Sequence, residues 1–210
     1  LRGPQGTLYG KNTTAGAINV LSQRPIFEQE GYARLGIGRF NQMDLEGAIN
    51  IPLSDTLAVR VAGASSRRDG WIFNTFNGDD VNAIDIQAGR IQVAYEPEGR
   101  HAFLFNLNGS LNRSDKFHGE SVGLSATGTN LQGFREPNDG IRLASYNNAG
   151  EINAGQFGGF FRYDYDGDAL QFASITAYNS TRQQIQLDTD QSPFRLIESN
   201  RRSKSWQWSQ

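Results

Sequence analysis

Apolar and polar residues alternate with a period of two along most of the chain after residue 25. The clearest stretch is Gln42–Ile51, in which Met43, Leu45, Ile49 and Ile51 would point to one side and the polar residues to the other. Such alternation predicts a β-strand with one apolar and one polar face. Similar patterns predict further strands at residues 32–39, 57–67, 83–95, 103–108, 156–165, 170–180 and 199–210. No segment shows a convincing helical period.

The connections between these strands alternate in length. Short turns are expected near residues 53–56, 97–100 and 166–168, and long loops near residues 69–82, 113–155 and 183–198. Outer-membrane β-barrels have this asymmetry, with short periplasmic turns and longer extracellular loops. The first strand would then run outward, and Arg39–Asn41 would be the first outer loop and the one short one. The long loops at 69–82, 113–155 and 183–198 would be the second, third and fourth outer loops. The strand at 170–180 has no clear parity, because Phe172 and Ile175 fall on opposite faces.

A soluble β-sandwich also consists of alternating strands separated by frequent turns. The sequential order of the strands, their length of about ten residues and the one-sided loop lengths favour a barrel instead. The expected fold class is therefore all-β, an antiparallel up-and-down transmembrane β-barrel.

The composition agrees with a barrel wall and argues against several other classes. The 210 residues have a mean hydropathy of −0.55, which strands that alternate between lipid and lumen can also have. No apolar run is long enough to predict a transmembrane helix. The net charge of −2 argues against nucleic acid as a partner. The absence of cysteine removes disulfides, thiol nucleophiles and thiolate metal sites.

The first 25 residues, LRGPQGTLYGKNTTAGAINVLSQRP, carry the most specific signal. A glycine-punctuated loop leads to a short apolar strand at Ala17–Leu21 and an exit at Arg24–Pro25. This order of residue types resembles the end of the plug domain of TonB-dependent receptors of the bacterial outer membrane. The motif residues that carry the resemblance are Arg2, Gly3, Pro4, Gly6, Tyr9, Gly10 and Gly16.

The same glycine-rich stretch could suggest a phosphate-binding loop ending at Gly10–Lys11. That motif needs a first glycine where Gln5 stands, and a hydroxyl residue where Asn12 stands. No alternation of parallel strands and helices follows either. The glycines are better explained by tight turns and close backbone packing.

The resemblance divides the chain into two parts. Residues 1–25 would be the C-terminal end of the plug, and residues 26–210 the N-terminal part of the barrel, with a long outer loop at about 113–155. Plugged transporters have about 22 strands, so some fourteen strands, on the order of 300 residues, would follow the eight seen here. The TonB box and most of the plug would precede Leu1, and Arg2 would pair with carboxylates of the barrel wall.

The resemblance also implies a function, which is energised uptake of a scarce ligand across the outer membrane. The implied partners are the TonB complex of the inner membrane, outer-membrane lipid and a small ligand. A ferric siderophore is expected first, with oligosaccharide, cobalamin or haem as alternatives. Two other classes stay open: a passive or structural outer-membrane barrel, which would lack a plug, and a soluble carbohydrate-binding β-sandwich.

Neither enzymatic activity nor a cofactor is expected. The two histidines, His101 and His118, lack the neighbours of a catalytic triad or a metal site. The acidic pairs Asp79–Asp80 and Asp188–Asp190 do not match an EF-hand loop, so no metal site is expected.

Candidate site residues fall into two groups. Ligand contacts are expected from loop residues, although aromatic side chains at a membrane surface can form an interfacial girdle instead. This loop group is Trp71, Phe73, Phe76, Phe117, His118, Phe134, Arg135 and Tyr146. The second group consists of strand charges that would face the lumen, where they could pair with the plug or be hydrated. This lumen group is Arg34, Asp44, Glu46, Arg60 and Arg162.

Overall fold

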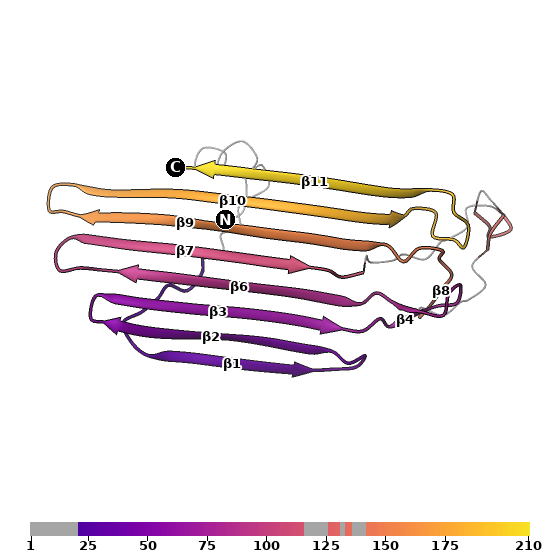
Figure 1. Ribbon diagram of the computed structural model, residues 1–210, viewed down its shortest axis with the longest axis horizontal. Helices are drawn as coiled ribbons and strands as arrows, with labels where there is room; N and C mark the ends of the chain where they lie inside the picture. The colour runs from indigo at the N-terminus through magenta and orange to yellow at the C-terminus, as the bar shows by residue number, and fades with distance from the viewer. Residues whose placement is uncertain (1–20, 116–125, 131–132, 136–141) are drawn as a thin grey trace.

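The computed structural model describes residues 21–115, 126–130, 133–135 and 142–210, most of which form one layer of antiparallel strands (Figure 1). Eight strands pair in the order β1-β2-β3-β6-β7-β9-β10-β11. Each strand of this sheet therefore lies beside its neighbours in the chain, as in an up-and-down barrel wall. The bounds are β1 Glu30–Ile37, β2 Met43–Ser54, β3 Leu57–Arg68, β6 Ile84–Tyr95, β7 His101–Asn112, β9 Glu151–Asp166, β10 Gln171–Asp188 and β11 Glu198–Ser209.

The two ends of the sheet differ, as the connection lengths predicted. The short turns β2–β3, β6–β7 and β9–β10 lie together at one end, and the long loops lie at the other (Figure 1). The short connection after β1 is a tight turn in which Phe40 and Asn41 both have positive φ, 61° and 53°. A two-residue hairpin turn that matches the twist of its strands requires positive φ at both central residues.

Several predicted boundaries were wrong at the loop end. Strand β9 begins at Glu151, so the third outer loop, expected at 113–155, ends earlier than predicted. Strand β10 continues to Asp188, well past the expected start of the fourth loop at 183. The polar residues there show no alternation, and the ladder of backbone hydrogen bonds between β9, β10 and β11 holds them in strand conformation. At the other end, β2 continues through an irregularity at Pro52 to Ser54, so that turn is shorter than predicted.

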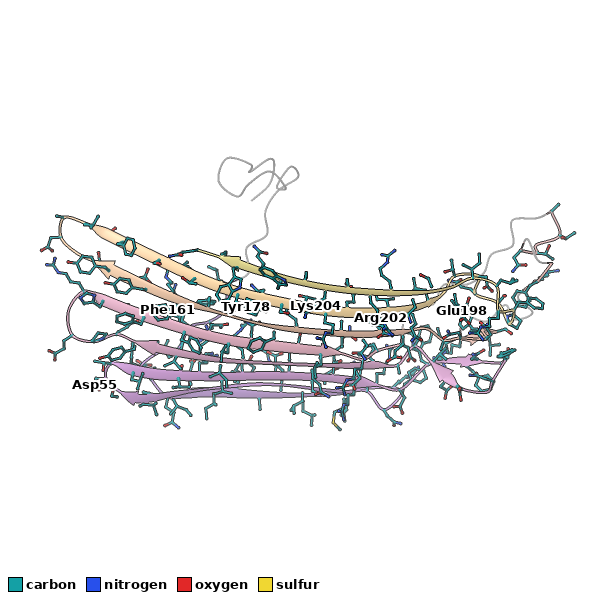
Figure 2. All side chains as sticks on the ribbon, turned by 45° about the horizontal axis from the view of Figure 1, so that its top comes forward. Asp55, Phe161, Tyr178, Glu198, Arg202 and Lys204 are labelled. Atoms are coloured by element: carbon teal, nitrogen blue, oxygen red, sulfur yellow. The ribbon has the colours of Figure 1, made fainter. Side chains whose placement is uncertain are left out.

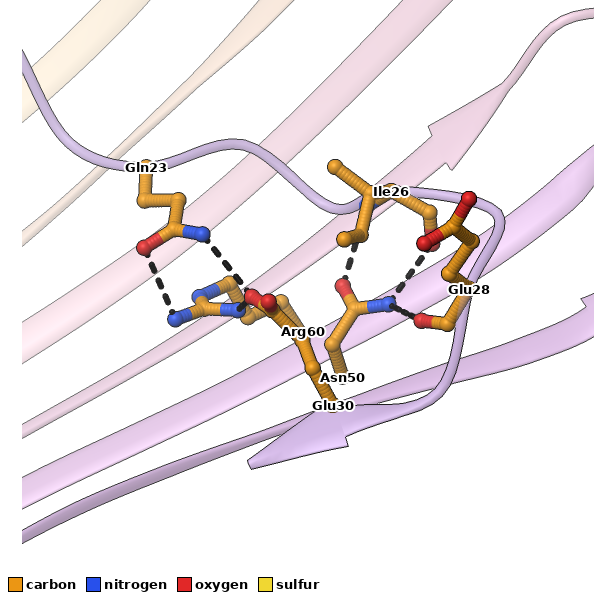
Figure 3. A network of polar contacts seen from close by, with 6 residues as sticks. All are labelled: Gln23, Ile26, Glu28, Glu30, Asn50 and Arg60. Carbon is orange, nitrogen blue, oxygen red and sulfur yellow. Dashed lines mark hydrogen bonds and ion pairs between the residues drawn. The ribbon is translucent and has the colours of Figure 1, made fainter. Parts of the chain in front are cut away.

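One face of the sheet carries the segment 21–29, and we call it the inner face. Ile26 and Gln23 hydrogen-bond to Asn50 and Arg60, which point to this side (Figure 3). Alternate residues of β2, β3, β6 and β7 are buried here. They are Ala48, Asn50, Ala58, Arg60, Gln92, Ala94, Leu104 and Asn106.

The opposite face, which we call the outer face, consists of exposed apolar side chains. They line up in cross-strand rows, for example Ile49 with Val61 and Ile91 with Leu107. No second layer covers this face within the described residues. The exposed members include Leu35, Ile37, Met43, Leu45, Ile49, Ile51, Val61, Ile91, Phe105, Leu107, Phe157, Phe161, Trp206 and Trp208. An uncovered apolar face of this extent fits contact with lipid and excludes the packed interior of a sandwich.

Aromatic rings border the apolar outer face. Near the short turns Phe103 lies 5.1 Å from Tyr163 and His101 lies 5.2 Å from Tyr165, measured between ring centroids. Nearer the loops, Tyr178 lies 4.9 Å from Trp208. Two aromatic girdles around an apolar band are typical of a transmembrane barrel. Strand β10 contributes Phe172 and Tyr178 to this face and Ile175 to the inner face, which resolves its parity.

The described residues contain no helix that is long and apolar enough to cross a membrane. The plug-motif residues Arg2, Gly3, Pro4, Gly6, Tyr9, Gly10 and Gly16 lie outside the described residues, so the division at residue 25 stays a prediction.

Candidate functional site

The second and third outer loops, which follow β3 and β7, form a small sheet of their own beyond the barrel strands (Figure 1). Its strands are β4 Ile72–Asn74, β5 Asp80–Val81 and β8 Leu143–Ala144, in the order β5-β4-β8. The apolar residues Ile72, Val81, Ala144 and Tyr146 form a buried cluster, and Trp71 and Ala149 pack against it. The loops at this end are therefore a folded unit with its own core, which we call the loop unit.

Asn74 joins the two loops. Its side chain is completely buried, its Nδ2 donates to the Tyr146 carbonyl at 2.9 Å, and its Oδ1 accepts from the Tyr146 N–H at 3.0 Å. The parallel pairing of β4 with β8 continues the connection through Phe73 and Leu143. Buried polar groups need such partners, so this amide fixes the spacing between loops that lie about 70 residues apart.

The loop residues expected to contact a ligand have different surroundings. Phe73 and Phe76 are about half exposed, at 44% and 52%. Trp71 and Tyr146 belong to the loop core, where they support the small sheet. Phe134 packs edge-on against Phe194 of the fourth loop, and Arg135 is exposed. Phe117 and His118 lie outside the described residues, and the whole set stays a prediction as a binding site.

A hollow of about 690 Å³ lies where the second, third and fourth loops meet. Phe76 comes from the second loop, Asn147 and Asn148 from the third, and Pro193 and Arg195 from the fourth. Arg195 is paired with Glu198 at 3.2 Å. An aromatic ring, amides and a guanidinium around one hollow offer stacking, hydrogen bonds and positive charge to a ligand. Sequence reasoning missed the asparagines and Arg195, because only the fold brings them beside Phe76.

The fourth loop is held by two carboxylates. Asp188 Oδ1 accepts from the backbone N–H groups of Asp190 and Gln191, each at 3.2 Å. Asp190 in turn accepts from the Ser192 hydroxyl and the Ile197 N–H. The second oxygen of Asp188 is buried and accepts no hydrogen bond among the described residues. Burial, together with the neighbouring negative charge of Asp190, raises the pKa of Asp188 from 3.8 to about 6.

This shift predicts a pH-dependent fourth loop. The folded state binds the Asp188 proton more tightly than the unfolded state does. Protonation of Asp188 therefore stabilises the fourth loop fully below about pH 3.8, and this stabilisation is lost as the pH rises through about 6. Amides of residues 188–197 should exchange with solvent increasingly readily, after correction for intrinsic rates, as the pH of the full-length protein passes 6. Asp188→Asn should remove this pH dependence. Asp55→Asn, in an exposed short turn, should leave it intact, and an unchanged profile in Asp188→Asn would contradict the assignment.

The structure places all five of the lumen group on the inner face. A guanidinium nitrogen of Arg34 lies 3.9 Å from a carboxylate oxygen of Glu46, and one of Arg162 lies 2.6 Å from Asp164. Both arginines therefore form ion pairs within the wall. Asp44 accepts from the Ser66 hydroxyl at 2.6 Å. Pairing of these charges with the plug stays a prediction, because residues 1–20 are not described.

Arg60 belongs to a cluster that ties segment 21–29 to the wall, and we call this cluster the linker clasp (Figure 3). Its guanidinium is only 6% exposed and donates to Glu30 at 2.8 Å and to Gln23 at 3.1 Å. Gln23 also donates to the same Glu30 oxygen at 2.8 Å. The buried charge is thus paired and hydrogen-bonded on both sides, as a guanidinium inside a protein must be.

Asn50 forms the other half of the linker clasp. Its Nδ2 donates to the carbonyls of Ile26 and Glu28, both at 2.6 Å, and its Oδ1 accepts from the Ile26 N–H at 3.0 Å (Figure 3). The amide therefore satisfies three backbone groups of a segment that belongs to no strand. The clasp fixes the chain on the inner face just before it enters β1.

The described residues contain no group of three or more potential metal ligands. His101 lies at the aromatic border of the outer face, where its Nδ1 is 3.0 Å from the Tyr163 hydroxyl. His118 lies outside the described residues.

Known receptors are similar to this chain in sequence and in architecture. Over 100 residues the chain is 31% identical to the pesticin receptor of Yersinia pestis, a match that covers 47% of this chain and 15% of that protein. Over 105 residues it is 30% identical to the ferric enterobactin receptor of Pseudomonas aeruginosa, covering 46% of this chain and 14% of the relative. The crystal structure of the ferric yersiniabactin uptake receptor FyuA from Yersinia pestis superimposes with a TM-score of 0.73 at 20% identity, over 90% of this chain. These similarities to siderophore receptors agree with the resemblance of the first 25 residues to TonB-dependent receptors.

The match to the FyuA fold confirms the expected class, an antiparallel up-and-down transmembrane barrel, of which the described residues form eight strands. The aligned part is 28% of the FyuA chain, and still less of the curated relatives. No family model matches the sequence.

Proposed function

We propose that this chain is part of a TonB-dependent receptor that takes up a ferric siderophore across the bacterial outer membrane with energy from the inner-membrane TonB complex. The observation that carries the proposal is the sequence similarity to a ferric enterobactin receptor, on a barrel whose loops fold into one unit. A pore wide enough for a bulky chelate would leak if it stayed open. A plug, of which residues 1–25 would be the end, closes the pore until work is applied.

In this proposal the ligand binds on the loop unit and the linker clasp keeps the entry into β1 in place. The hollow beside Phe76 and Arg195 offers aromatic, amide and cationic groups from three loops. TonB would act on a plug segment upstream of residue 1. Because Asn50 and Arg60 hold residues 23–30 on the wall, rearrangement of the plug would leave the barrel itself unchanged.

The regulation of the gene in its native host tests the ligand class. Iron complexes are scarce when iron is withdrawn, so the proposal expects expression to rise under iron starvation. Oligosaccharide, cobalamin and haem are the alternative cargoes. Expression that rises only on a particular glycan, and not on iron withdrawal, would contradict the siderophore assignment.

Disconnecting the second and third loops should weaken ligand binding. Asn74→Ala removes both hydrogen bonds between the buried Asn74 amide and the Tyr146 backbone, at a cost of about 1–3 kcal/mol to the loop unit. If the ligand needs the ordered unit, affinity should fall about tenfold. Binding of a ferric siderophore to the purified full-length receptor measures this directly. The control is Asn77→Ala, which removes only an exposed contact with Asp79, and equal affinities of the two variants would show that the loop junction does not shape the site.

A further inference from the structure

Three basic side chains gather on the outer face of β10 and β11. Arg182 and Lys204 are direct cross-strand partners, and Arg202 lies two residues along β11 on the same face. In Figure 2, Arg202 and Lys204 lie between the aromatic residues Phe161 and Tyr178 and the loop end marked by Glu198. We call Arg182, Arg202 and Lys204 the basic cluster.

The basic cluster contains repulsion that nothing described in the structure offsets. Like charges directly opposite each other on neighbouring strands are destabilising, and a diagonal neighbour lies only about 7–8 Å away. None of the ion pairs formed by the described residues includes a member of the cluster. The acidic residue of β11 on the same face, Glu198, is paired with Arg195. The arrangement therefore calls for an anion from outside the described chain.

The depth of the cluster identifies the source of that anion. Phe172 belongs to the aromatic border at the short-turn end, and Arg182 follows it by ten positions along β10. A transmembrane β-strand needs about 9–11 residues to cross the apolar core. Trp206 and Trp208 follow Arg202 and Lys204 along β11, on the membrane side of the cluster. The three cations thus lie at the level of the outer-leaflet head groups, one step beyond the aromatic girdle.

The surface beside the cations is hollowed. The lining of a space of about 750 Å³ includes Leu111, Gly155, Phe157, Arg182, Arg202 and Lys204, together with polar side chains of β9, β10 and β11. Gly155 stands between Leu111 and Arg182 in the cross-strand row and presents no side chain there. The hollow therefore brings two apolar side chains, Leu111 and Phe157, beside the three cations at the level of the head groups.

From this juxtaposition we propose that the basic cluster and its hollow bind the phosphorylated glycolipid of the outer leaflet, with phosphate on the cations and the lipid body over Leu111 and Phe157. Arg recognises phosphate through charge-assisted hydrogen bonds, and Lys adds a point charge. The inference concerns the outside of the barrel. It holds whichever ligand the loops bind, so its failure would leave the proposed uptake function untouched.

The test uses the purified full-length receptor in detergent, titrated with bisphosphorylated lipid A and with its dephosphorylated form. Bound lipid is counted by native mass spectrometry. The wild type should bind the phosphorylated form at least tenfold more tightly. The triple variant Arg182→Gln, Arg202→Gln, Lys204→Gln should lose this preference, because each charge-assisted contact contributes more than a neutral one.

Two further variants keep the result interpretable. Arg201→Gln removes a cation from the same strand on the inner face and should change nothing. Gly155→Leu fills the hollow without altering any charge and should weaken lipid binding too. A β-carbon at residue 155 would meet Leu111 at an ordinary 3.5 Å, so the strand tolerates the change. Equal binding of both lipid forms, an equal loss in Arg201→Gln, or full displacement of the lipid by inorganic phosphate would overturn the proposal.

Discussion

Replacing Leu107 by arginine should lower the free energy of unfolding of the full-length receptor in lipid bilayers by about 2–4 kcal/mol. Leu107 lies on the outer face of β7, in register with Ile91, and midway between the aromatic border at Phe103 and the end of the strand. A guanidinium there would lie in the apolar core of the membrane without a partner. Denaturant titration of the receptor folded into vesicles measures the change.

The matched control is Leu111→Arg on the same strand and the same face. Leu111 lies in the cross-strand row of Arg182 and Lys204, at the level of the head groups. An arginine at the interface costs only about 0–1 kcal/mol. If both variants were destabilised equally, or if Leu107→Arg had no effect, the outer face would not be the lipid face and the barrel assignment would be wrong.

The second large effect is expected from Asn50→Leu in the linker clasp. The substitution removes three hydrogen bonds and leaves the Ile26 N–H and the carbonyls of Ile26 and Glu28 without a partner. At about 1 kcal/mol for each group, the linker should be held on the wall about 3 kcal/mol less tightly. We expect the variant to admit large antibiotics into living cells without a transported ligand, because the plug end is held on the wall less tightly.

Asn108→Leu serves as the control for this variant. Asn108 points to the same inner face, and its amide donates to Asn106 of the same strand, at 2.8 Å. It should therefore leave antibiotic sensitivity at the wild-type level. Equal sensitivity of the Asn50 and Asn108 variants would mean that general damage to the inner wall, and not release of the linker, opens the pore.

The sequence could predict the membrane-spanning part of the wall because lipid imposes a strict alternation. Met43, Leu45, Ile49 and Ile51 had to share a face, and the register with β1 and β3 places them there. Above the membrane this constraint ends. The upper half of β10, with Gln183, Gln184 and Gln186, is strand only because its neighbours supply hydrogen bonds, and no local pattern marks it.

The loop unit and the linker clasp could not be predicted because their contacts join distant parts of the chain. Asn74 and Tyr146 are 72 positions apart, and nothing in either loop specifies the other. Asn50 and Asn106 occupy equivalent polar positions in the sequence pattern, yet among the described contacts only Asn50 holds the linker. Arg60 was recognised as an inner-face charge from alternation, but its partners are Gln23, in a segment without periodicity, and Glu30, at the very start of β1.

Uptake of radiolabelled ferric siderophore by the native host tests the central claim most directly. The account predicts that uptake is lost when the receptor gene is deleted, is restored by the full-length receptor, and is lost again when TonB is removed although the receptor is present. Uptake that continues in the receptor deletion would show that the ligand is wrong. Receptor-dependent uptake that persists without TonB would show a passive barrel and contradict the account.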